Sequence, residues 1–306
     1  MSVSSSTTST PAFSDPGAGG LPPRGVLGVL TKYWMIFRAS LVERMTYRGD
    51  FFFATILRFL PMLTTILLWD AIYSGAKAKS GATELGSSSI HYSYNEMIAY
   101  LLMVNISRMF SSMPGLASGI AREIRDGTLK KYLLQPIEML GYLVSYRAAH
   151  KIAYIATTAL PYALLFFVCR HYFEGLVPTD PVTWLAFLAS LILSFVIGFY
   201  FEACVGMVGF WFLEVTSLLY IVMTMNFFIS GHMLPLDLLP APWSTLLKCL
   251  PFQYMAYFPA VVFLGKIQGA DLARELAFQT AWSLAFILLA HWLYRRGLKR
   301  YSAFGG

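Results

Sequence analysis

Charged residues are scarce in this sequence: 13% of its 306 residues are Asp, Glu, Lys or Arg, whereas 57% are hydrophobic. A soluble protein of this length could not bury so much apolar surface and still present a polar exterior to water. The composition therefore excludes an ordinary water-soluble globular protein. It fits a chain whose solvent is the lipid bilayer, which a helix crosses with about 20 mostly apolar residues.

The common catalytic and metal-binding motifs are also missing. The sequence has no GxxxxGK[ST] loop for a nucleoside triphosphate, no HExxH and no GxSxG. Cys169, Cys204 and Cys249 lie far apart in or beside apolar stretches, and the five histidines are scattered without carboxylates at ligand spacing. We therefore expect a chain that is not an enzyme and that binds no metal or other cofactor itself.

The first 25 residues are rich in Ser, Thr, Pro and Gly, and they have neither a basic start nor an apolar core. This composition predicts a disordered cytoplasmic tail and not a signal peptide. The formal net charge of +7 does not indicate a nucleic-acid partner, because the basic residues flank hydrophobic stretches instead of clustering on a polar domain.

Hydropathy predicts an all-α integral membrane protein with six transmembrane helices. Residues 26–45 carry a helical apolar stripe with basic and aromatic residues, which is typical of an amphipathic helix in the membrane interface. The six spans are expected at residues 51–73, 97–120 and 148–169, at two places within 182–234, and at 276–294. Gly206, Gly209 and Glu214 mark the turn between the fourth and fifth spans.

The distribution of lysine and arginine predicts the orientation of these spans. The positive-inside rule assigns the more basic flanks to the cytoplasm. On one side lie Arg24, Lys32, Arg38, Arg44, Arg48, Arg122, Arg125, Lys130, Lys131, Arg147, Lys151, Arg295, Arg296, Lys299 and Arg300. The other side has only Lys77, Lys79, Arg170, Lys248, Lys266 and Arg274. Both termini are therefore expected in the cytoplasm.

Arg108 and Asn105 are the polar residues within the second span that could line a substrate path. An arginine near the centre of a membrane helix costs at least ~2.5–3.5 kcal/mol, so it should face protein or a cavity. The alternative is an ion pair with Glu96, Glu202 or Glu214 that only fixes helix packing. An apolar, aromatic-rich path would suit amphiphilic or cationic molecules, lipids or glycans, and Arg108 would favour an anion only if it is unpaired.

The fourth span contains a ridge of small residues that repeats every four positions. Small residues in this pattern let two helix backbones approach closely, within one subunit or across a dimer. Glu202 belongs to the ridge and should therefore face protein and not lipid, which makes it a third candidate for the substrate path. The ridge consists of Ser190, Ser194, Gly198, Glu202 and Gly206.

A polar stretch at residues 122–136, between the second and third spans, mixes charges of both signs with apolar residues. It is broken at Gly127 and ended by Pro136. This mixture suits docking into a groove on a partner protein. The alternative is a solvated loop whose charges only set the topology. The residues assigned to docking are Glu123, Ile124, Arg125, Asp126, Gly127, Thr128, Leu129, Leu133, Leu134 and Pro136.

With these features in this order, the chain resembles a permease subunit of an ABC exporter, of the type-2 ABC permease superfamily. The amphipathic helix before the first span and the Glu123-to-Pro136 loop, which is similar to the coupling segment of that family, carry two parts of the resemblance. The third part follows the fifth span and is similar to the family's short helices that re-enter the outer leaflet. It consists of Ser230-Gly231, Leu234-Pro235-Leu236, Leu239-Pro240, Trp243, Leu250-Pro251-Phe252 and Tyr254.

The resemblance is closest to a bacterial branch in which two different permeases commonly accompany one ATPase. It implies a type-2 ABC transmembrane domain over residues 26–300, flanked by tails at 1–25 and 301–306. It further implies a bacterial cytoplasmic membrane, nucleotide-binding ATPase subunits that hold ATP and Mg²⁺, and a second permease subunit, identical or paralogous. Two other functions stay open at this point: a self-standing channel or secondary carrier, and a membrane-embedded enzyme or scaffold.

Overall fold

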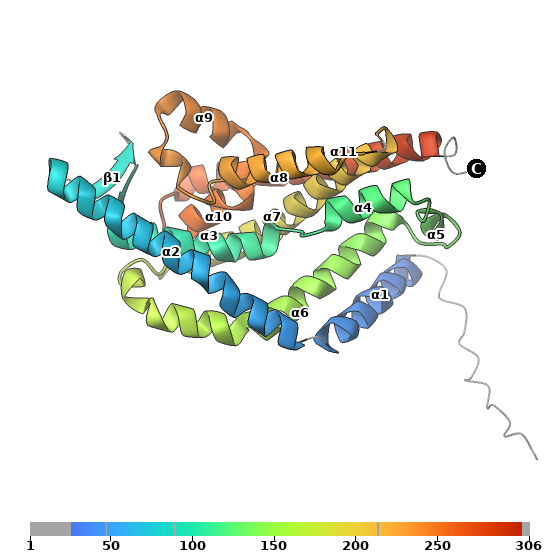
Figure 1. Ribbon diagram of the computed structural model, residues 1–306, viewed down its shortest axis with the longest axis horizontal. Helices are drawn as coiled ribbons and strands as arrows, with labels where there is room; N and C mark the ends of the chain where they lie inside the picture. Colours follow the sequence, from blue (N-terminus) through green and yellow to red (C-terminus); the bar gives the residue numbers. More distant parts are fainter. Residues whose placement is uncertain (1–25, 47, 82, 88–89, 213, 302–306) are drawn as a thin grey trace, which may run out of the picture.

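The computed structural model describes residues 26–46, 48–81, 83–87, 90–212 and 214–301 (Figure 1). The predicted tail at residues 1–25 lies outside the described residues, as does nearly all of the tail at 301–306. The elements that follow are therefore those of the part of the chain that begins at Val26.

Helices make up most of the described chain, as predicted. The α-helices are α1 (Val26–Thr46), α2 (Arg48–Ser80), α3 (Tyr94–Ser111), α4 (Leu116–Arg125), α5 (Lys130–Leu133), α6 (Met139–Val168), α7 (Pro181–Met207), α8 (Thr216–Ile229), α9 (Ala241–Cys249), α10 (Tyr257–Phe263) and α11 (Gly269–Tyr301). Four short 3₁₀ helices are η1 (Arg170–Phe173), η2 (Val208–Phe210), η3 (Leu236–Leu238) and η4 (Pro251–Met255). An antiparallel hairpin of β1 (Glu84–Ser87) and β2 (Ile90–Ser93) was not predicted.

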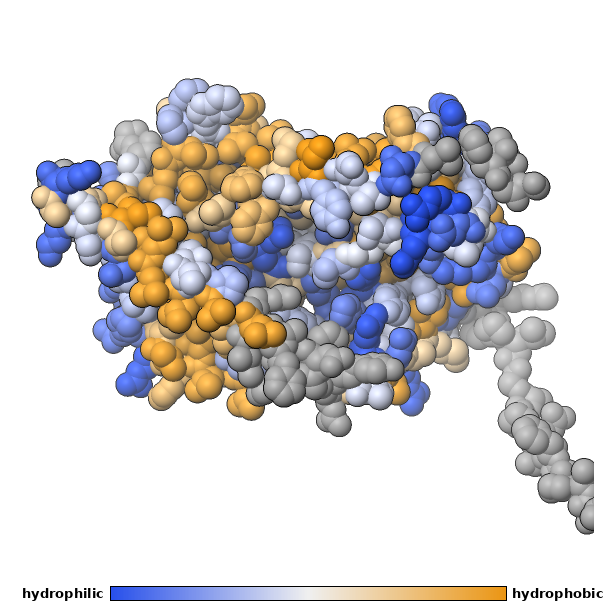
Figure 2. All heavy atoms as spheres, in the orientation of Figure 1, coloured by the Kyte–Doolittle hydropathy of each residue, from blue (hydrophilic) through white to orange (hydrophobic). Residues whose placement is uncertain are grey.

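Among the residues that the structure describes, four helices are long and apolar enough to cross a membrane, so the chain is an integral membrane protein by this measure. They cover Phe59–Lys79 within α2, Met139–Val168 (α6), Pro181–Phe210 (α7 with η2) and Gly269–Tyr301 (α11). These stretches overlap the predicted first, third, fourth and sixth spans. Figure 2 shows apolar residues over the part of the surface that α2 forms, and hydrophilic residues gathered at the end that carries α5.

The prediction of one continuous helix over residues 97–120 is wrong. α3 ends at Ser111 and α4 begins at Leu116, because Pro114 and Gly115 interrupt the helix and Gly115 adopts a positive φ of 76°. The predicted fifth span is also shorter than expected. α8 has 14 residues, which corresponds to about 21 Å, whereas the hydrocarbon core of a bilayer is about 30 Å thick.

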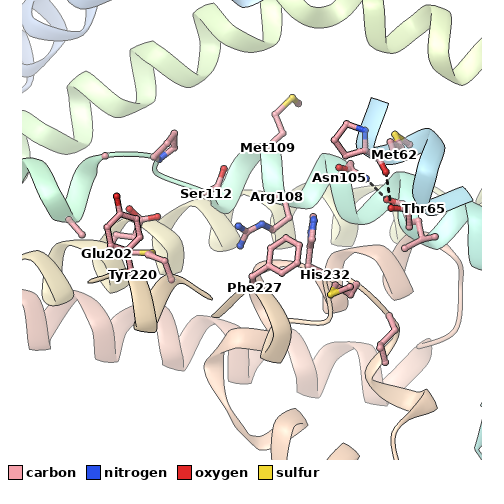
Figure 3. Close-up of a pocket in the computed structure, with 18 of the residues that line it drawn as sticks. Met62, Thr65, Asn105, Arg108, Met109, Ser112, Glu202, Tyr220, Phe227 and His232 are labelled. Carbon is pink, nitrogen blue, oxygen red and sulfur yellow. Dashed lines mark hydrogen bonds between the residues drawn. The ribbon is translucent and has the colours of Figure 1, made fainter. Parts of the chain in front are cut away.

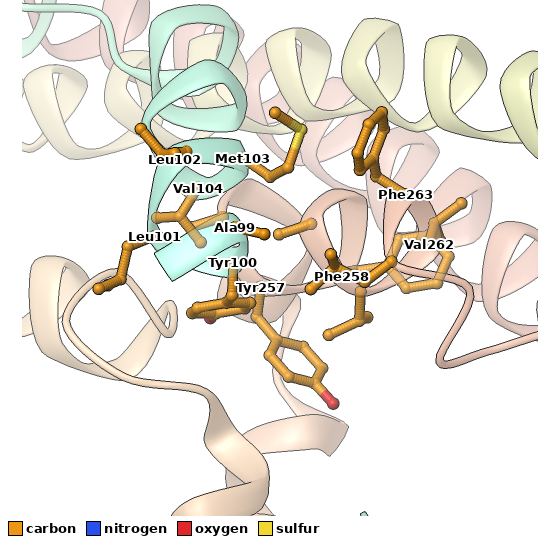
Figure 4. Packing of buried hydrophobic residues seen from close by; sticks show 14 of the residues in the cluster. Ala99, Tyr100, Leu101, Leu102, Met103, Val104, Tyr257, Phe258, Val262 and Phe263 are labelled. Atoms are coloured by element: carbon orange, nitrogen blue, oxygen red, sulfur yellow. The ribbon is translucent and has the colours of Figure 1, made fainter. Parts of the chain in front are cut away.

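α7 lies at the centre of the molecule. It packs against α3, α4, α10, α11 and η4, and its buried residues run along most of its length. Beside it, α10 packs on α3, where Tyr100 and Val104 meet Tyr257 and Phe258 in the main hydrophobic core (Figure 4). α3, α4, α10 and α11 are therefore positioned by one central helix.

The helix predicted at residues 26–45 is present as α1, which packs along α6, while its place in the membrane interface stays a prediction. Gly141 of α6 makes this approach possible, since a Cβ there would lie 2.6 Å from the hydroxyl oxygen of Tyr33. Leu30, Trp34 and Met35 stay exposed on α1. An exposed apolar strip of this kind suits contact with lipid.

A buried carboxylate joins the hairpin to the short helices between α8 and α11. Asp237 in η3 accepts hydrogen bonds from the hydroxyls of Tyr92 (2.9 Å) and Tyr257 (2.7 Å), and it forms an ion pair with Lys248 of α9. The bond from Tyr92 explains the hairpin: β1 and β2 bring this tyrosine to Asp237, a long-range pairing that a local sequence pattern does not reveal.

Candidate functional site

The break between α3 and α4 is held by charged side chains from α6 and α7. Met113 donates its backbone N–H to Glu202 Oε1 of α7 at 3.0 Å. Arg147 of α6 donates to the carbonyl of Pro114 at 3.0 Å, and Lys151, one turn further on, donates to the carbonyls of Met109 and Ser112. Four backbone groups at the break therefore have side-chain partners.

The predicted ridge on α7 packs within the chain, against η4 and against the helices on both sides of the break. Ser194 donates to the carbonyl of Tyr254 at 2.6 Å. At Gly198 an added Cβ would lie 1.9 Å from the carbonyl oxygen of Ser111, and at Gly206 it would lie 2.6 Å from that of Ala117. The backbones thus meet at the glycines, and this approach brings Glu202 to the break.

A cavity of about 940 Å³ lies beside the break (Figure 3). Its walls come mainly from α2, α3 and α8, with contributions from the 112–115 break, α4, α6 and α7 and from the chain after α8. Most of the lining is apolar, and the polar residues gather on the side of α3 and the break. The lining residues are Pro61, Met62, Thr65, Leu68, Trp69, Ile72, Leu101, Asn105, Arg108, Met109, Ser112, Pro114, Gly115, Ala117, Ser118, Tyr162, Glu202, Thr216, Leu219, Tyr220, Met223, Phe227, His232, Met233 and Leu234.

The three residues predicted for a substrate path, Asn105, Arg108 and Glu202, all lie on the wall of this one cavity. Asn105 uses its side-chain N–H₂ to donate to the carbonyl of Leu101 one turn earlier, at 2.8 Å. Glu202 is 6% exposed and is the only carboxylate among the lining residues. The structure thus brings the three side chains together, while their role as a path stays a prediction.

Arg108 has no ion pair with any carboxylate among the residues that the structure describes. Its Nη1 atom is buried and has no hydrogen-bond partner there. Each acid that the sequence offered as a partner is engaged elsewhere: Glu96 pairs with Lys266, Glu214 pairs with Arg125, and Glu202 accepts from Met113. The structure therefore does not support the reading of Arg108 as one half of a packing ion pair.

The predicted docking stretch comprises residues 122–136 and is called the 122–136 segment. It consists of the end of α4, a turn with Gly127 at a φ of 71°, the single-turn helix α5, and the chain up to Pro136. Ile124 and Leu129 are buried in the same hydrophobic cluster as Phe210 and Tyr294. The side of the 122–136 segment that carries Ile124 and Leu129 is thus packed in the core of the molecule.

The outer side of the 122–136 segment presents polar residues and two leucines. Leu133 is 49% exposed and Leu134 is 83% exposed. Glu123 forms an ion pair with Lys131, which ties the end of α4 to α5. Arg125, Asp126, Thr128 and Pro136 are also exposed, whereas Glu123 and Gly127 are half-buried. Of the ten predicted docking residues, Ile124 and Leu129 are therefore anchors, and the exposed ones could meet a partner.

An ion pair links the 122–136 segment to α8. Arg125 Nη1 lies 3.6 Å from Glu214 Oε2, immediately before the start of α8. Glu214 also accepts from the backbone N–H of Thr216 at 2.9 Å. Hydrogen bonds from the Thr216 side chain and backbone, together with the nearby Arg125, hold the pKa of the Glu214 carboxyl below its ordinary value.

Arg147, Lys151 and His232 are residues of this site that the sequence did not single out. Arg147 and Lys151 were counted only as basic residues that set the topology. Their spacing of four places both on one face of α6, which is a signal that they act together. Nothing local in the sequence indicates that their partners are backbone carbonyls of another helix, or that His232 reaches the cavity.

Comparison with known proteins agrees with the resemblance drawn from the motifs. The model of the family described as ABC-2 family transporter protein matches residues 59–305, which is well over half of the chain. No curated protein matches the chain as a relative. Permeases of this family are membrane subunits of ABC transporters, whose ATP-hydrolysing subunits are their partners. The chain belongs to the ABC-2 transporter family and is an ABC transporter permease.

Proposed function

We propose that this chain is the membrane subunit of an ATP-driven exporter and that it couples through the 122–136 segment to a separate nucleotide-binding subunit. The observation that carries the proposal is α4. Its first residue follows the cavity-lining break, and its last residue, Arg125, belongs to the segment. A helix of 10 residues is about 15 Å long. A displacement of the segment is therefore transmitted to the cavity wall through α4 alone.

In this proposal the chain crosses the membrane six times, with both termini in the cytoplasm of a bacterial cell. α2, α6, α7 and α11 each cross it, α3 and α4 together make one interrupted crossing, and α8 makes the remaining one with the chain that follows it. The short helices between α8 and α11 re-enter the outer leaflet, and α1 lies in the inner interface. In support, the 122–136 segment and the basic end of α11 lie at the same end of the molecule (Figure 1).

The 112–115 break gives this arrangement a place to bend. When the ATPase pair closes on ATP, the 122–136 segment and α4 move, and the break lets the angle between α4 and α3 change. The ion pair between Arg125 and Glu214 passes the movement to α8, which forms another wall of the cavity. The transporter then has two conformations, and nucleotide binding shifts the equilibrium between them. The cavity opens to one side of the membrane in the first conformation and to the other side in the second. A second permease subunit, identical or paralogous, completes the path.

One observation favours a self-standing carrier as the second candidate. Broken helices with backbone groups at a binding site are typical of secondary transporters. Such carriers pair two broken helices by internal symmetry, however, and neither the sequence nor the helices between Val26 and Tyr301 show a symmetric counterpart of the 112–115 break. Family membership also favours the ABC permease.

Isolation of the native complex tests the proposal. We expect the full-length chain, tagged and extracted in a mild detergent from its own cells, to carry with it a second protein that has a P-loop and hydrolyses ATP. Reconstituted into liposomes, the complex should export a substrate only when ATP is supplied on the side of the 122–136 segment. Isolation without any ATPase, together with transport by the chain alone, would establish the carrier instead.

A further inference from the structure

Positive charges lie on the wall of the cavity beside the 112–115 break and behind the carbonyls of that break. Arg108 lies on its wall, and Arg147 and Lys151 reach the carbonyls of Pro114, Met109 and Ser112, which line it. Glu202 is the one carboxylate in the lining, and Met113 occupies its Oε1. Three cations therefore meet one anion around the polar side of the cavity.

Arg108 is the cation that this surrounding leaves without a partner. Glu202 lines the same cavity but forms no ion pair with Arg108. Three of the carbonyls at the break already accept from Arg147 and Lys151. The buried Nη1 of Arg108 thus lacks an acceptor among the described residues. An arginine presents several N–H donors in a planar fork that matches a phosphate or carboxylate group.

A second polar side chain lies near Arg108. Figure 3 shows His232 and Arg108 projecting into the same part of the cavity, with the ring of Phe227 beside them. The Nδ1 atom of His232 is also buried without a hydrogen-bond partner in the described part of the chain. Two buried nitrogens without a hydrogen-bond partner, one from α3 and one from the chain after α8, therefore belong to the lining of one cavity.

The rest of the cavity is built for an apolar body. Met62, Leu68, Trp69 and Ile72 form one wall on α2, and Leu219, Tyr220, Met223 and Phe227 form another on α8. Leu68 and Tyr220 are exposed at the surface of the chain, so these apolar walls continue to the surface that meets lipid or a second subunit. A mostly apolar pocket with a few convergent polar groups is the usual form of a small-molecule site.

We infer that the cavity binds an amphiphile with an anionic head, whose phosphate or carboxylate lies against Arg108 and His232 and whose apolar chain lies between α2 and α8. This inference rests on the proposed function for the meaning of the cavity as a transport site, although binding itself needs no ATPase. Arg108 provides the charge that selects the head, and the walls of α2 and α8 hold the tail.

A series of ligands with one tail and different heads tests the inference on the unaltered protein. The full-length chain in dodecyl maltoside is titrated with radiolabelled dodecyl phosphate, dodecyltrimethylammonium and inorganic phosphate. We expect dodecyl phosphate to bind about tenfold or more tightly than the cationic amphiphile, and about a hundredfold or more tightly than inorganic phosphate, which lacks the tail. Equal affinity for the two amphiphiles would overturn the anionic head, and equal affinity for inorganic phosphate would overturn the amphiphile.

Variants of Arg108 then test whether this residue selects the head group. Arg108→Gln should weaken the binding of dodecyl phosphate about tenfold to a hundredfold and remove the preference for the anionic head, whereas Arg108→Lys should keep the preference. Arg274→Gln is the matched control, because Arg274 is exposed at the start of α11 and paired with Asp271. If Arg108→Gln binds dodecyl phosphate as tightly as Arg274→Gln does and keeps the same preference for the anionic head, Arg108 does not select the head. If Arg108→Gln does not fold, the ligand series on the unaltered protein and the Arg108→Lys variant still test whether the site prefers an anionic head.

The result of these binding experiments can be distinguished from the result of the experiment that tests the proposed function. Loss of head-group preference in a chain that still carries its ATPase would reject the substrate class alone. Preference for the anionic amphiphile in a chain that carries no ATPase would reject the exporter and keep the site.

Discussion

Replacing Leu133 and Leu134 together with serine is expected to abolish the association of the permease with its ATPase. The two leucines are the largest apolar side chains on the outer side of the 122–136 segment, and Leu134 is 83% exposed. Burial of a leucine at an interface contributes about 1.5–3 kcal/mol. Loss of both should therefore weaken the complex more than about a hundredfold. The measurement is the amount of ATPase that is isolated with the tagged variant, followed by ATP-dependent transport.

The exposed positions are the right ones for this experiment. Ile124 and Leu129 are buried in the core, so their replacement would impair folding and docking alike. The matched control replaces Trp243 and Leu246, two exposed apolar residues of α9, which lies away from α5, with serine (Figure 1). We expect this control to keep the ATPase. If both double variants retain it equally, the 122–136 segment is not the docking site.

Gly198→Ala is expected to destabilise the folded chain severely. The new methyl carbon would lie 1.9 Å from the carbonyl oxygen of Ser111 and 2.8 Å from its carbonyl carbon. Both are backbone atoms that cannot rotate away, so α3 and α7 would have to move apart. This movement would disturb the hydrogen bond from Ser111 Oγ to the carbonyl of Met255 (2.7 Å), and the bond between Glu202 and Met113 one turn along α7.

Overpacking of a close-packed interior typically costs about 1–3 kcal/mol, and a clash with backbone lies at the upper end of that range. We expect the thermal midpoint of the purified variant to fall by about 5 °C or more. Gly119→Ala is the control, because nothing lies within 4 Å of the Cβ that it would add to α4. Alanine favours a helix over glycine, so the control should be as stable as the native chain or slightly more so. Equal midpoints for the two variants would show that α3 and α7 do not meet as described.

The elements that could be predicted from the sequence are those that depend on local signals. Hydropathy found α6, α7 and α11, and Gly206 with Gly209 correctly marked the end of α7 near Met207. The four-residue spacing of small residues identified a packing ridge, because close approach of two helices requires small residues at the contact. Family membership, predicted from the order of three motifs, is confirmed.

The break at residues 112–115 shows where hydropathy reasoning fails. Pro114-Gly115 is a strong breaker pair, yet a window of about 20 apolar residues averages over it, and the prediction ran the helix on to residue 120. The side chains that bind the broken ends come from elsewhere in the chain. Glu202, Arg147 and Lys151 satisfy the freed backbone groups, and these contacts between distant residues leave no periodic pattern in the sequence.

The state of Arg108 could not be predicted for the same reason. The sequence offered Glu96, Glu202 and Glu214 as partners on equal terms, since spacing along the chain does not reveal which carboxylates reach the second span. The structure separates them by their other contacts: Glu96 is held by Lys266 and Glu214 by Arg125. An arginine that appeared equally suited to packing or to binding is therefore left facing a cavity.

The sidedness of the 122–136 segment is the most direct test of the whole account. Thr128 is exposed in the turn between α4 and α5, and of the three native cysteines only Cys249 is exposed. A Thr128→Cys, Cys249→Ser chain is treated with a membrane-impermeant maleimide in intact cells and in inside-out membrane vesicles. The account predicts labelling only in the inside-out vesicles, where the cytoplasmic face is accessible. Labelling in intact cells would place the 122–136 segment outside, where no ATPase could reach it, and would contradict the proposed coupling.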